Sequence, residues 1–298
     1  MTELDWRKRL ELTAGRYQMM ALERGLRLAA GLEPRTIAVG ELDLAVLERK
    51  RPGVPVVLIH GFGGDKETWL LMAPRLRGCP MVLLDLPGHG ASTVVGRDAA
   101  SPAAMGRNVV AALDALGHDR VHLVGNSMGG GIALWVARHH AARIASLTLV
   151  ASVAPELAES ELTRALARGE NLLIPGDDDP DAFIKMVVEK PPRVPRAIKR
   201  YVAARRAAAR PVLEELFRGW AFAAPEHGLP PDLEAIEHST LIIHGARDRI
   251  IHPDTARKVV KRLPRARLEV LEGIGHVPQL EAPGVVARLI HRHLQEQR

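Results

Sequence analysis

Cysteine is almost absent from this sequence, which has a single one, Cys79, among 298 residues. A lone thiol excludes a disulfide framework within the chain, so we expect the protein to work in a reducing, cytoplasmic compartment. The sequence also lacks an apolar h-region near its N-terminus and an uncharged apolar run of about 18 residues. It therefore predicts neither a signal peptide nor a membrane-spanning helix.

Positive charge is concentrated in one segment. The formal net charge is +6, and eight Arg or Lys against two Glu lie between Pro191 and Arg218, a difference equal to the whole excess. Neither a nucleic-acid recognition module nor a row of aromatic residues accompanies these charges, so we expect no nucleic-acid partner. A solvated helix face is the simplest interpretation, and peripheral contact with an anionic membrane is the alternative.

Most of the chain alternates short apolar runs with helical stretches. Hydrophobic residues make up 47% of the chain, enough to bury the core of one large α/β domain or two small ones. Continuous apolar strands separated by helices are typical of a mostly parallel sheet covered on both faces. The predicted strands are residues 55–59, 80–85, 120–124, 145–150, 239–243 and 266–271. Before them, residues 36–50 predict a hairpin that turns at Gly40 and Glu41.

Two segments stand outside this alternation. Residues 4–31 carry apolar positions among Arg and Lys, which predicts an amphipathic N-terminal helix that docks on the core or lies on a membrane. Between Ala151 and Ser239, helical periodicity with proline breaks replaces the strands and predicts a helical insertion. We therefore expect an N-terminal helix (residues 1–34), an α/β core (residues 35–151 and 239–298) and a helical cap (residues 152–238), hereafter the cap segment.

The stretch GNSMG, residues 125–129, fits the pattern G-x-S-x-G. It follows the predicted strand 120–124 and precedes a predicted helix over residues 128–140, so the chain must turn sharply at Ser127. Glycines allow a turn that is too tight for other side chains and leave the serine hydroxyl exposed above the carboxyl edge of the sheet. We interpret Ser127 as a nucleophile, and the alternative is a serine that only caps the helix.

A serine nucleophile needs a general base and a group that orients this base, because the neutral hydroxyl is weakly reactive. In this type of fold the order along the chain is Ser, then Asp or Glu, then His. Asp248 and His276 each follow a predicted strand, at the edge where open α/β sheets build their sites. We therefore expect Ser127, Asp248 and His276 to form a triad, although Asp248 could instead cap the turn before Pro253.

The stretch HGFGGDK, residues 60–66, supplies a candidate donor for a developing oxyanion. Its glycines let the backbone pass close to a bound acyl group, and the Phe62 N–H is the natural first donor. The second is the Met128 N–H, at the start of the helix after Ser127. A dinucleotide fingerprint would need glycine at the position of Lys66, and a P-loop would need Gly-Lys-Ser/Thr, which is absent.

The remaining histidines show no comparable pattern. His60 and His244 end apolar strands, and we interpret them as packed residues. His291 and His293 are two residues apart in the last predicted helix, so they face different directions and make a poor metal pair. We therefore expect neither a metal nor an organic cofactor.

These motifs together resemble the α/β-hydrolase family. HGFGGDKETW, LLDLPGHGAS, LVGNSMGG, HGARDRIIHPD and GHVPQLEAP stand in the family's order over nearly the whole chain. More narrowly, HGFGGDK, GNSMGG, GHVPQLE and the cap stretch FIKMVVEKPPRVPRAIK are similar to bacterial lipases and esterases related to the monoacylglycerol lipases. The resemblance implies a Ser127 nucleophile, His276 as base and then acid, and Asp248 as its orienting partner. It also implies Phe62 and Met128 as the oxyanion donors.

The sequence thus predicts a serine carboxylic-ester hydrolase that acts through an acyl-enzyme on a small-molecule ester or acylglycerol. Apolar residues of the cap segment are expected either to bind the acyl chain or to pack the cap helices on one another. The candidates for substrate binding are Phe183, Met186, Val187, Trp220 and Phe222. No oligomeric state is predicted.

Two other functions compete with this one. Carbon–carbon hydrolases of the meta-cleavage type share the GNSMGG stretch, but in them the histidine is often followed by tryptophan, where this chain has Val277. A hydrolase-fold binding protein without turnover is the third interpretation. Such proteins usually lack a member of the triad, whereas all three candidates are present here.

Overall fold

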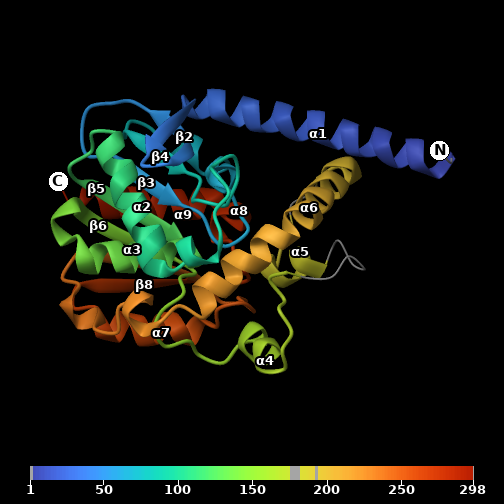
Figure 1. Cartoon of the computed structure of the whole chain (residues 1–298). Coiled ribbons are helices and arrows are strands. Elements are labelled where there is room, and N and C mark those ends of the chain that lie inside the picture. Colours follow the sequence, from blue (N-terminus) through green and yellow to red (C-terminus); the bar gives the residue numbers. More distant parts are fainter. Residues whose placement is uncertain (1–2, 175–181, 192–193, 298) are drawn as a thin grey trace.

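The computed structural model describes residues 3–174, 182–191 and 194–297, with the backbone alone for residues 3–5, 7, 182 and 183. Its centre is a sheet of eight strands in the order β1-β2-β4-β3-β5-β6-β7-β8 (Figure 1). The strands are β1 (Glu33–Val39), β2 (Leu42–Arg49), β3 (Val56–Ile59), β4 (Met81–Leu84), β5 (Val121–Asn126), β6 (Ile144–Val150), β7 (Thr240–Gly245) and β8 (Ala266–Leu271). The α-helices are α1 (Glu3–Ala30), α2 (Pro102–Ala115), α3 (Met128–His139), α4 (Glu161–Ala167), α5 (Ala182–Val187), α6 (Arg196–Ala221), α7 (Pro253–Arg262), α8 (Pro278–Glu281) and α9 (Pro283–Gln295).

The sheet is mostly parallel, as the sequence predicts. β1 and β2 form the expected hairpin, β2 pairs antiparallel with β4, and the pairs from β4 through β3, β5, β6 and β7 to β8 are all parallel. Each predicted strand lies within two residues of an observed one. The helices of the core flank the sheet, so the predicted fold class is confirmed.

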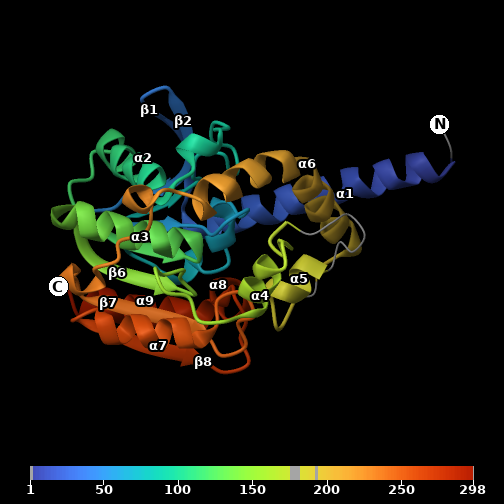
Figure 2. The same cartoon turned by 60° about the horizontal axis from the view of Figure 1, so that its bottom comes forward.

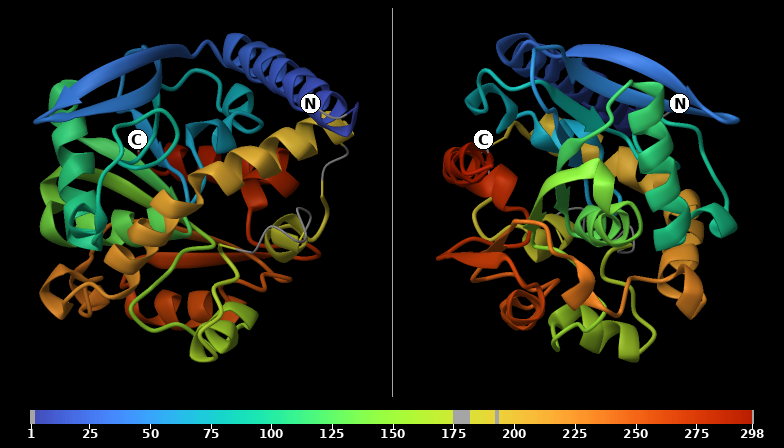
Figure 3. Two further views of the ribbon diagram at one scale, coloured as in Figure 1. Left: turned by 45° about the vertical axis from the view of Figure 1, so that its right-hand side comes forward. Right: turned by 90° about the vertical axis from the view of Figure 1, so that its left-hand side faces the viewer.

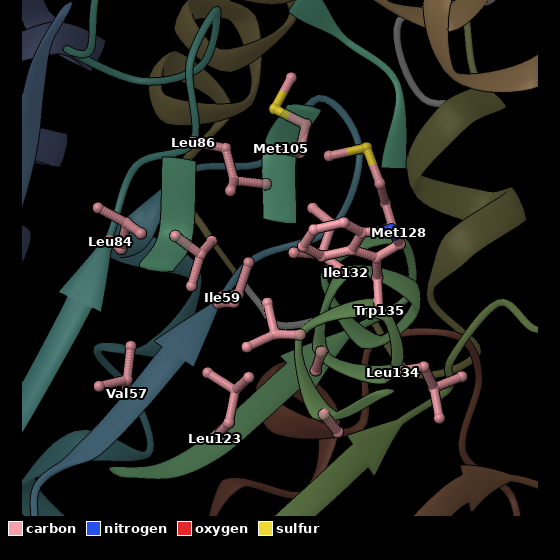
Figure 4. Close-up of a cluster of buried hydrophobic side chains, with 14 of the residues drawn as sticks. Val57, Ile59, Leu84, Leu86, Met105, Leu123, Met128, Ile132, Leu134 and Trp135 are labelled. Carbon is pink, nitrogen blue, oxygen red and sulfur yellow. The ribbon is translucent and has the colours of Figure 1, made fainter. Parts of the chain in front are cut away.

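The apolar strands are continuous because both faces of the sheet are covered. Alternate side chains of β3 point to opposite faces. Val57 and Ile59 join the cluster beneath α2 and α3, whereas Val56 and Leu58 join the cluster that includes α9. Figure 4 shows the first cluster, in which β3 faces Trp135 of α3. Full burial of each such side chain contributes about 1.5–3 kcal/mol.

Three described helices, α4, α5 and α6, lie between β6 and β7 in the chain. The C-terminal half of α6 packs into the core through Leu213 and Leu216. Gly88 makes room for this contact, because a methyl group built on it would lie 2.8 Å from a Leu216 Cδ atom. In Figure 2 the three helices lie on the side of the molecule nearest α1.

Helix α1 projects from the sheet and runs beside α6 (Figures 1 and 3). Gly15 permits close approach, since a methyl group built on it would lie 2.0 Å from the Ala197 carbonyl oxygen. Glu11 and Arg200 form an ion pair across the same contact. Within the described ranges, no helix combines the length and the apolar character that crossing a membrane requires.

Candidate active site

Ser127 lies at a strained turn between β5 and α3. Its φ of 53° and ψ of −116° place a non-glycine residue in a region that costs roughly 1–3 kcal/mol. The flanking glycines are required by contact, because a methyl group on Gly125 would lie 2.2 Å from the Gly129 carbonyl oxygen. A methyl group on Gly129 would lie 2.5 Å from the carbonyl oxygens of Ile59 and His60. The G-x-S-x-G spacing therefore sets how closely α3 approaches β3 and β5.

The structure brings the three predicted triad residues together. His276, after β8, has its Nε2 2.9 Å from Ser127 Oγ and its Nδ1 2.8 Å from an oxygen of Asp248, which follows β7. The side chains lie at the carboxyl ends of β5, β7 and β8, and all three residues are buried. Since an ionised carboxylate only accepts, Nδ1 carries the ring proton and Nε2 is assigned as the acceptor of the Ser127 hydroxyl.

The carboxylate of Asp248 is held by four donors. Its Oδ1 accepts from the backbone N–H groups of Ile250 and Ile251, each at 2.9 Å. Its Oδ2 lies 3.2 Å from His244 Nε2 as well as close to His276. Burial by itself raises the pKa of Asp248, but the charge of His276 and the hydrogen bonds from His244 and His276 outweigh burial and leave this pKa below its ordinary value. Asp248 is therefore ionised at neutral pH.

Two residues around the triad were not identified from the sequence. His244 was interpreted only as a packed residue, yet its ring lies against Asp248 and also 2.8 Å from the Ile251 carbonyl oxygen. Asn126 is buried beside Ser127, and its Nδ2 donates to the carbonyl oxygens of Val150 at 3.0 Å and His276 at 3.5 Å. The sequence held one signal for the role of His244, because this residue lies near the end of the strand that leads to Asp248.

Residues 60–66, hereafter called the oxyanion loop after their predicted role, approach Ser127 closely at Gly61. A methyl group built on Gly61 would be 3.1 Å from Ser127 Cβ. The ring of Phe62 packs edge-on against His89 and Phe217, with centroid distances of 6.1 and 5.9 Å. Met128 is the first residue of α3, where backbone N–H groups have no acceptor within the helix, and its side chain is buried in the core (Figure 4). Met128 therefore follows Ser127 directly, and Phe62 follows Gly61, which contacts Ser127; the oxyanion role of both N–H groups stays a prediction.

The predicted substrate-binding residues differ in position. Val187 is buried, and its carbonyl oxygen accepts from the His276 N–H at 2.9 Å, while Met186 packs in the same cluster. Trp220 lies near α3, since a methyl group on Gly131 would be 3.3 Å from its ring. Phe222 is 79% exposed and faces solvent. The side chain of Phe183 lies outside the described residues.

Among the residues whose placement is described, no group of three or more His, Cys, Asp or Glu side chains is arranged to hold a metal ion.

Comparisons with known proteins identify the family of this chain. The model of the alpha/beta hydrolase fold family matches residues 54–283. Lipase 1 of Psychrobacter immobilis is 30% identical over 83% of this chain and 78% of that protein. Monoacylglycerol lipase abhd6-A of Xenopus laevis is 25% identical over 89% of this chain and 82% of that one. For 2-hydroxymuconate semialdehyde hydrolase of Pseudomonas putida, the identity is 31% over 82% of this chain and 88% of that one.

A solved structure is similar over almost the whole chain. The crystal structure of a membrane phospholipase A, described as a novel bacterial virulence factor, covers 96% of this chain and 93% of its own. Its TM-score is 0.86 at 32% sequence identity. This chain belongs to the α/β-hydrolase fold family, as its motifs predict.

Proposed function

We propose that this protein hydrolyses carboxylic esters through a covalent acyl-enzyme on Ser127. The hydrogen-bonded series from Ser127 through His276 to Asp248 carries the proposal. Ser127 Oγ attacks the ester carbonyl carbon while His276 Nε2 takes the hydroxyl proton, which then passes to the departing alcohol. Water attacks the acyl-enzyme by the same route, and the products are a carboxylic acid and free Ser127.

The buried carboxylate and the backbone donors supply the electrostatic part of the reaction. Asp248 stabilises the imidazolium that forms on His276 and keeps the ring in the required tautomer. The N–H groups of Phe62 and Met128 stabilise the oxyanion, and one such donor contributes roughly 10²- to 10³-fold to kcat. The lipases among the relatives and the similarity to a phospholipase A support an ester as the substrate.

Substrate selection is assigned to the cap segment. In this division, the predicted core (residues 35–151 and 239–298) supplies the chemistry and the cap segment covers the site. The N-terminal unit, residues 1–34, contains α1 (Glu3–Ala30) and the first two residues of β1 (Glu33–Val39). Met186 and Val187 belong to the cap segment and lie next to the backbone of His276, so their apolar side chains suit an acyl chain near the reacting carbon. A medium-chain ester such as a monoacylglycerol fits this arrangement, with Trp220 as a further contact.

A carbon–carbon hydrolase is the second candidate. The 2-hydroxymuconate semialdehyde hydrolase among the relatives is 31% identical to this chain, and this similarity supports the second candidate. Both reactions can use the same serine, histidine and aspartate. The two reactions differ in the bond that is broken, so the rates on the two kinds of substrate distinguish them.

A panel of substrates separates these candidates. It contains monoacylglycerols, p-nitrophenyl esters from acetate to palmitate, and a ring-cleavage dienoate, each with wild-type protein and with Ser127→Ala. We expect the highest kcat/KM on medium-chain esters and no turnover by the variant. Faster cleavage of the dienoate than of any ester would contradict ester hydrolysis. A preference for acetate over all longer chains would contradict the acyl-chain site.

We propose further that α1 contacts a membrane surface peripherally. Large apolar side chains are exposed along this helix, namely Trp6, Leu10, Tyr17, Met20, Leu22 and Leu28. They stand among Arg and Lys residues, and α6, beside α1, adds more positive charge. Exposed apolar groups together with cations favour an anionic lipid surface.

Vesicle binding tests this contact. Leu10 and Tyr17 are seven residues apart and share a face of α1, so the double variant Leu10→Ser, Tyr17→Ser removes apolar area from one side. We expect it to bind phosphatidylglycerol vesicles more weakly than the wild type. The matched control is Val94→Ser, because Val94 and Tyr17 are each 66% exposed. Equal binding by the double variant and the wild type would contradict the proposed contact.

A further inference from the structure

Helix α6 of the cap segment contacts the oxyanion loop at three successive places. The Phe217 ring packs against the Phe62 ring, with centroids 5.9 Å apart. Arg206 Nη1 donates to the Gly63 carbonyl oxygen at 3.5 Å. Arg205 pairs with the Asp65 carboxylate at 2.5 Å. Helix α6 therefore contacts the loop at Gly63 and on both sides of it.

Arg206 also joins the loop to another part of the cap segment. Its second terminal nitrogen donates to the Leu173 carbonyl oxygen, so one guanidinium bridges two backbone carbonyls. A methyl group on Gly63 would lie 3.0 Å from Arg206 Nη1, which shows how closely the two groups meet. Burial lowers the pKa of Arg206 to about 10, so the guanidinium keeps its charge at neutral pH.

The loop needs such support because of its own composition. Gly63 has a φ of +65°, and three of the residues between His60 and Asp65 are glycines, which lose more conformational freedom on ordering than other residues. Within the loop, the Gly64 N–H donates to the Gly61 carbonyl oxygen at 3.1 Å. An oxyanion donor must lie within a few tenths of an ångström of its working position, so contacts from outside the loop affect the rate.

We propose that Arg206 is a positioning residue of the oxyanion hole, which orients the Phe62 N–H by holding the Gly63 carbonyl from the cap segment. Arg205 and Phe217 are the outer contacts of the same clamp. The proposal rests on the assignment of Phe62 as an oxyanion donor. Its consequence is that the placement of the cap sets the quality of the oxyanion hole, so a residue of the cap governs kcat as well as substrate choice.

The test compares Arg206→Ala and Arg206→Lys with a control on the same helix, Arg218→Ala. Arg218 is exposed and pairs with Glu215, three residues away on the same helix. On p-nitrophenyl butyrate we expect Arg206→Ala to lower kcat about 10- to 50-fold, part of the loss caused by removing a whole oxyanion donor, with little change in KM. Arg206→Lys should recover part of kcat, because an ammonium can reach one carbonyl but lacks the planar fork that spans two. Arg218→Ala should match the wild type.

A second measurement separates positioning from a structural role. A trifluoromethyl ketone with a butyl chain forms an oxyanion on Ser127, whereas the product butyrate does not. Affinity for the ketone should fall in Arg206→Ala by the same factor as kcat/KM, while inhibition by butyrate stays constant. Equal losses for ketone and butyrate would overturn the proposal, as would a kcat close to that of the wild type.

The same series of variants includes controls for folding and for the proposed role of Ser127. Arg206→Gln keeps the side-chain stem packed, and thermal unfolding is followed for every variant. If alanine, lysine and glutamine at this position all abolish the folding transition, Arg206 is structural and the proposal is wrong. If Ser127→Ala retains turnover, the proposed nucleophile fails instead, so the two failures are distinguishable.

Discussion

The catalytic edge of the sheet and the cap segment are held by different kinds of contact. Around Ser127, backbone meets backbone, and Gly125 and Gly129 leave no space for a side chain. In the cap segment, long side chains reach across to the core, as Arg205 does to Asp65. Short, rigid contacts fix the reacting groups, whereas long side chains can adjust. This difference is what the proposed division of labour predicts, with the chemistry on the sheet and the fit of the substrate on the cap segment.

After loss of the proposed nucleophile itself, the largest expected effect comes from the orienting carboxylate. Asp248→Asn keeps the shape of the side chain but removes the negative charge and an acceptor of the His276 Nδ1 proton. We expect kcat to fall about 10⁴-fold while the protein stays folded. Asp254→Asn is the matched control, because Asp254 is exposed and pairs with Arg257 at the surface. Steady-state kinetics on a soluble ester checks the difference, and a loss of less than tenfold would remove Asp248 from the proposed triad.

Backbone contact at the serine turn predicts the next largest effect, on stability. Gly129→Ala forces a methyl group to within 2.5 Å of the carbonyl oxygens of Ile59 and His60, and we expect a loss of about 3 kcal/mol or more in the free energy of unfolding. Gly25→Ala in α1 is the control, since a methyl group there meets nothing within 4 Å. Alanine favours a helix by roughly 0.5–1 kcal/mol relative to glycine, so the control should be slightly stabilised. Urea unfolding measures the difference in the free energy of unfolding between the two variants. Equal stability of both would show that the turn tolerates a side chain.

A half-buried carboxylate next to the oxyanion loop predicts a pH-dependent difference in stability. Burial raises the pKa of Glu67 to about 7, and the charge of Asp65 acts in the same direction. Because this pKa lies above the unfolded value, the folded state binds the proton more tightly, and stability falls as pH rises from about 4.5 to about 7.

Glu67→Gln should remove this penalty. We expect the variant to be more stable than the wild type at pH 8, on the order of 1–3 kcal/mol, and nearly equal to it at acidic pH. Lys66 would keep its partner Asp85 at 2.6 Å. Glu215→Gln, at an exposed ion pair, is the control, and we expect it to change stability little at either pH. Thermal unfolding curves at the two pH values measure these differences. The same change in stability for Glu67→Gln at both pH values would contradict the expected dependence on pH.

The smallest expected effect lies at the end of α6. Phe222 is 79% exposed, so Phe222→Ala should change kcat/KM by less than about twofold on esters of any chain length. Trp220→Ala removes a partly buried ring near α3 and should lower kcat/KM most for the longer acyl chains. A chain-length series for both variants tests which of these predicted residues faces the substrate. An equal effect of the two substitutions would show that exposure does not separate them.

The sheet could be predicted from the sequence because its signals are local. The apolar run of β3 buries both faces, and the turn residues that follow each strand mark where the polar side chains emerge. Asp248 and His276 were placed at strand ends on this basis, and the structure brings them to Ser127. The domain division and the roles of these residues stay predictions until they are tested by variants.

The contacts of the cap segment could not be predicted in the same way. Arg205 lies 140 residues from Asp65, and no local pattern tells which of the basic residues of this segment reaches the loop. In the sequence, the cluster of cations suggested either a solvated face or a lipid contact, and the clamp on the oxyanion loop became visible only with the fold. His244 was missed for a similar reason, because a histidine at a strand end has the same sequence pattern whether or not it contacts a carboxylate.

Covalent labelling by a fluorophosphonate tests the proposed nucleophile most directly. The tryptic peptide of residues 121–138 contains Ser127 as its only hydroxyl side chain, so mass spectrometry locates the adduct without ambiguity. Wild-type protein should carry one phosphonyl group on this peptide, and His276→Ala should remain unlabelled over the same time because its serine is not activated. Labelling of another residue, or equal labelling of wild type and His276→Ala, would contradict a Ser127 nucleophile activated by His276.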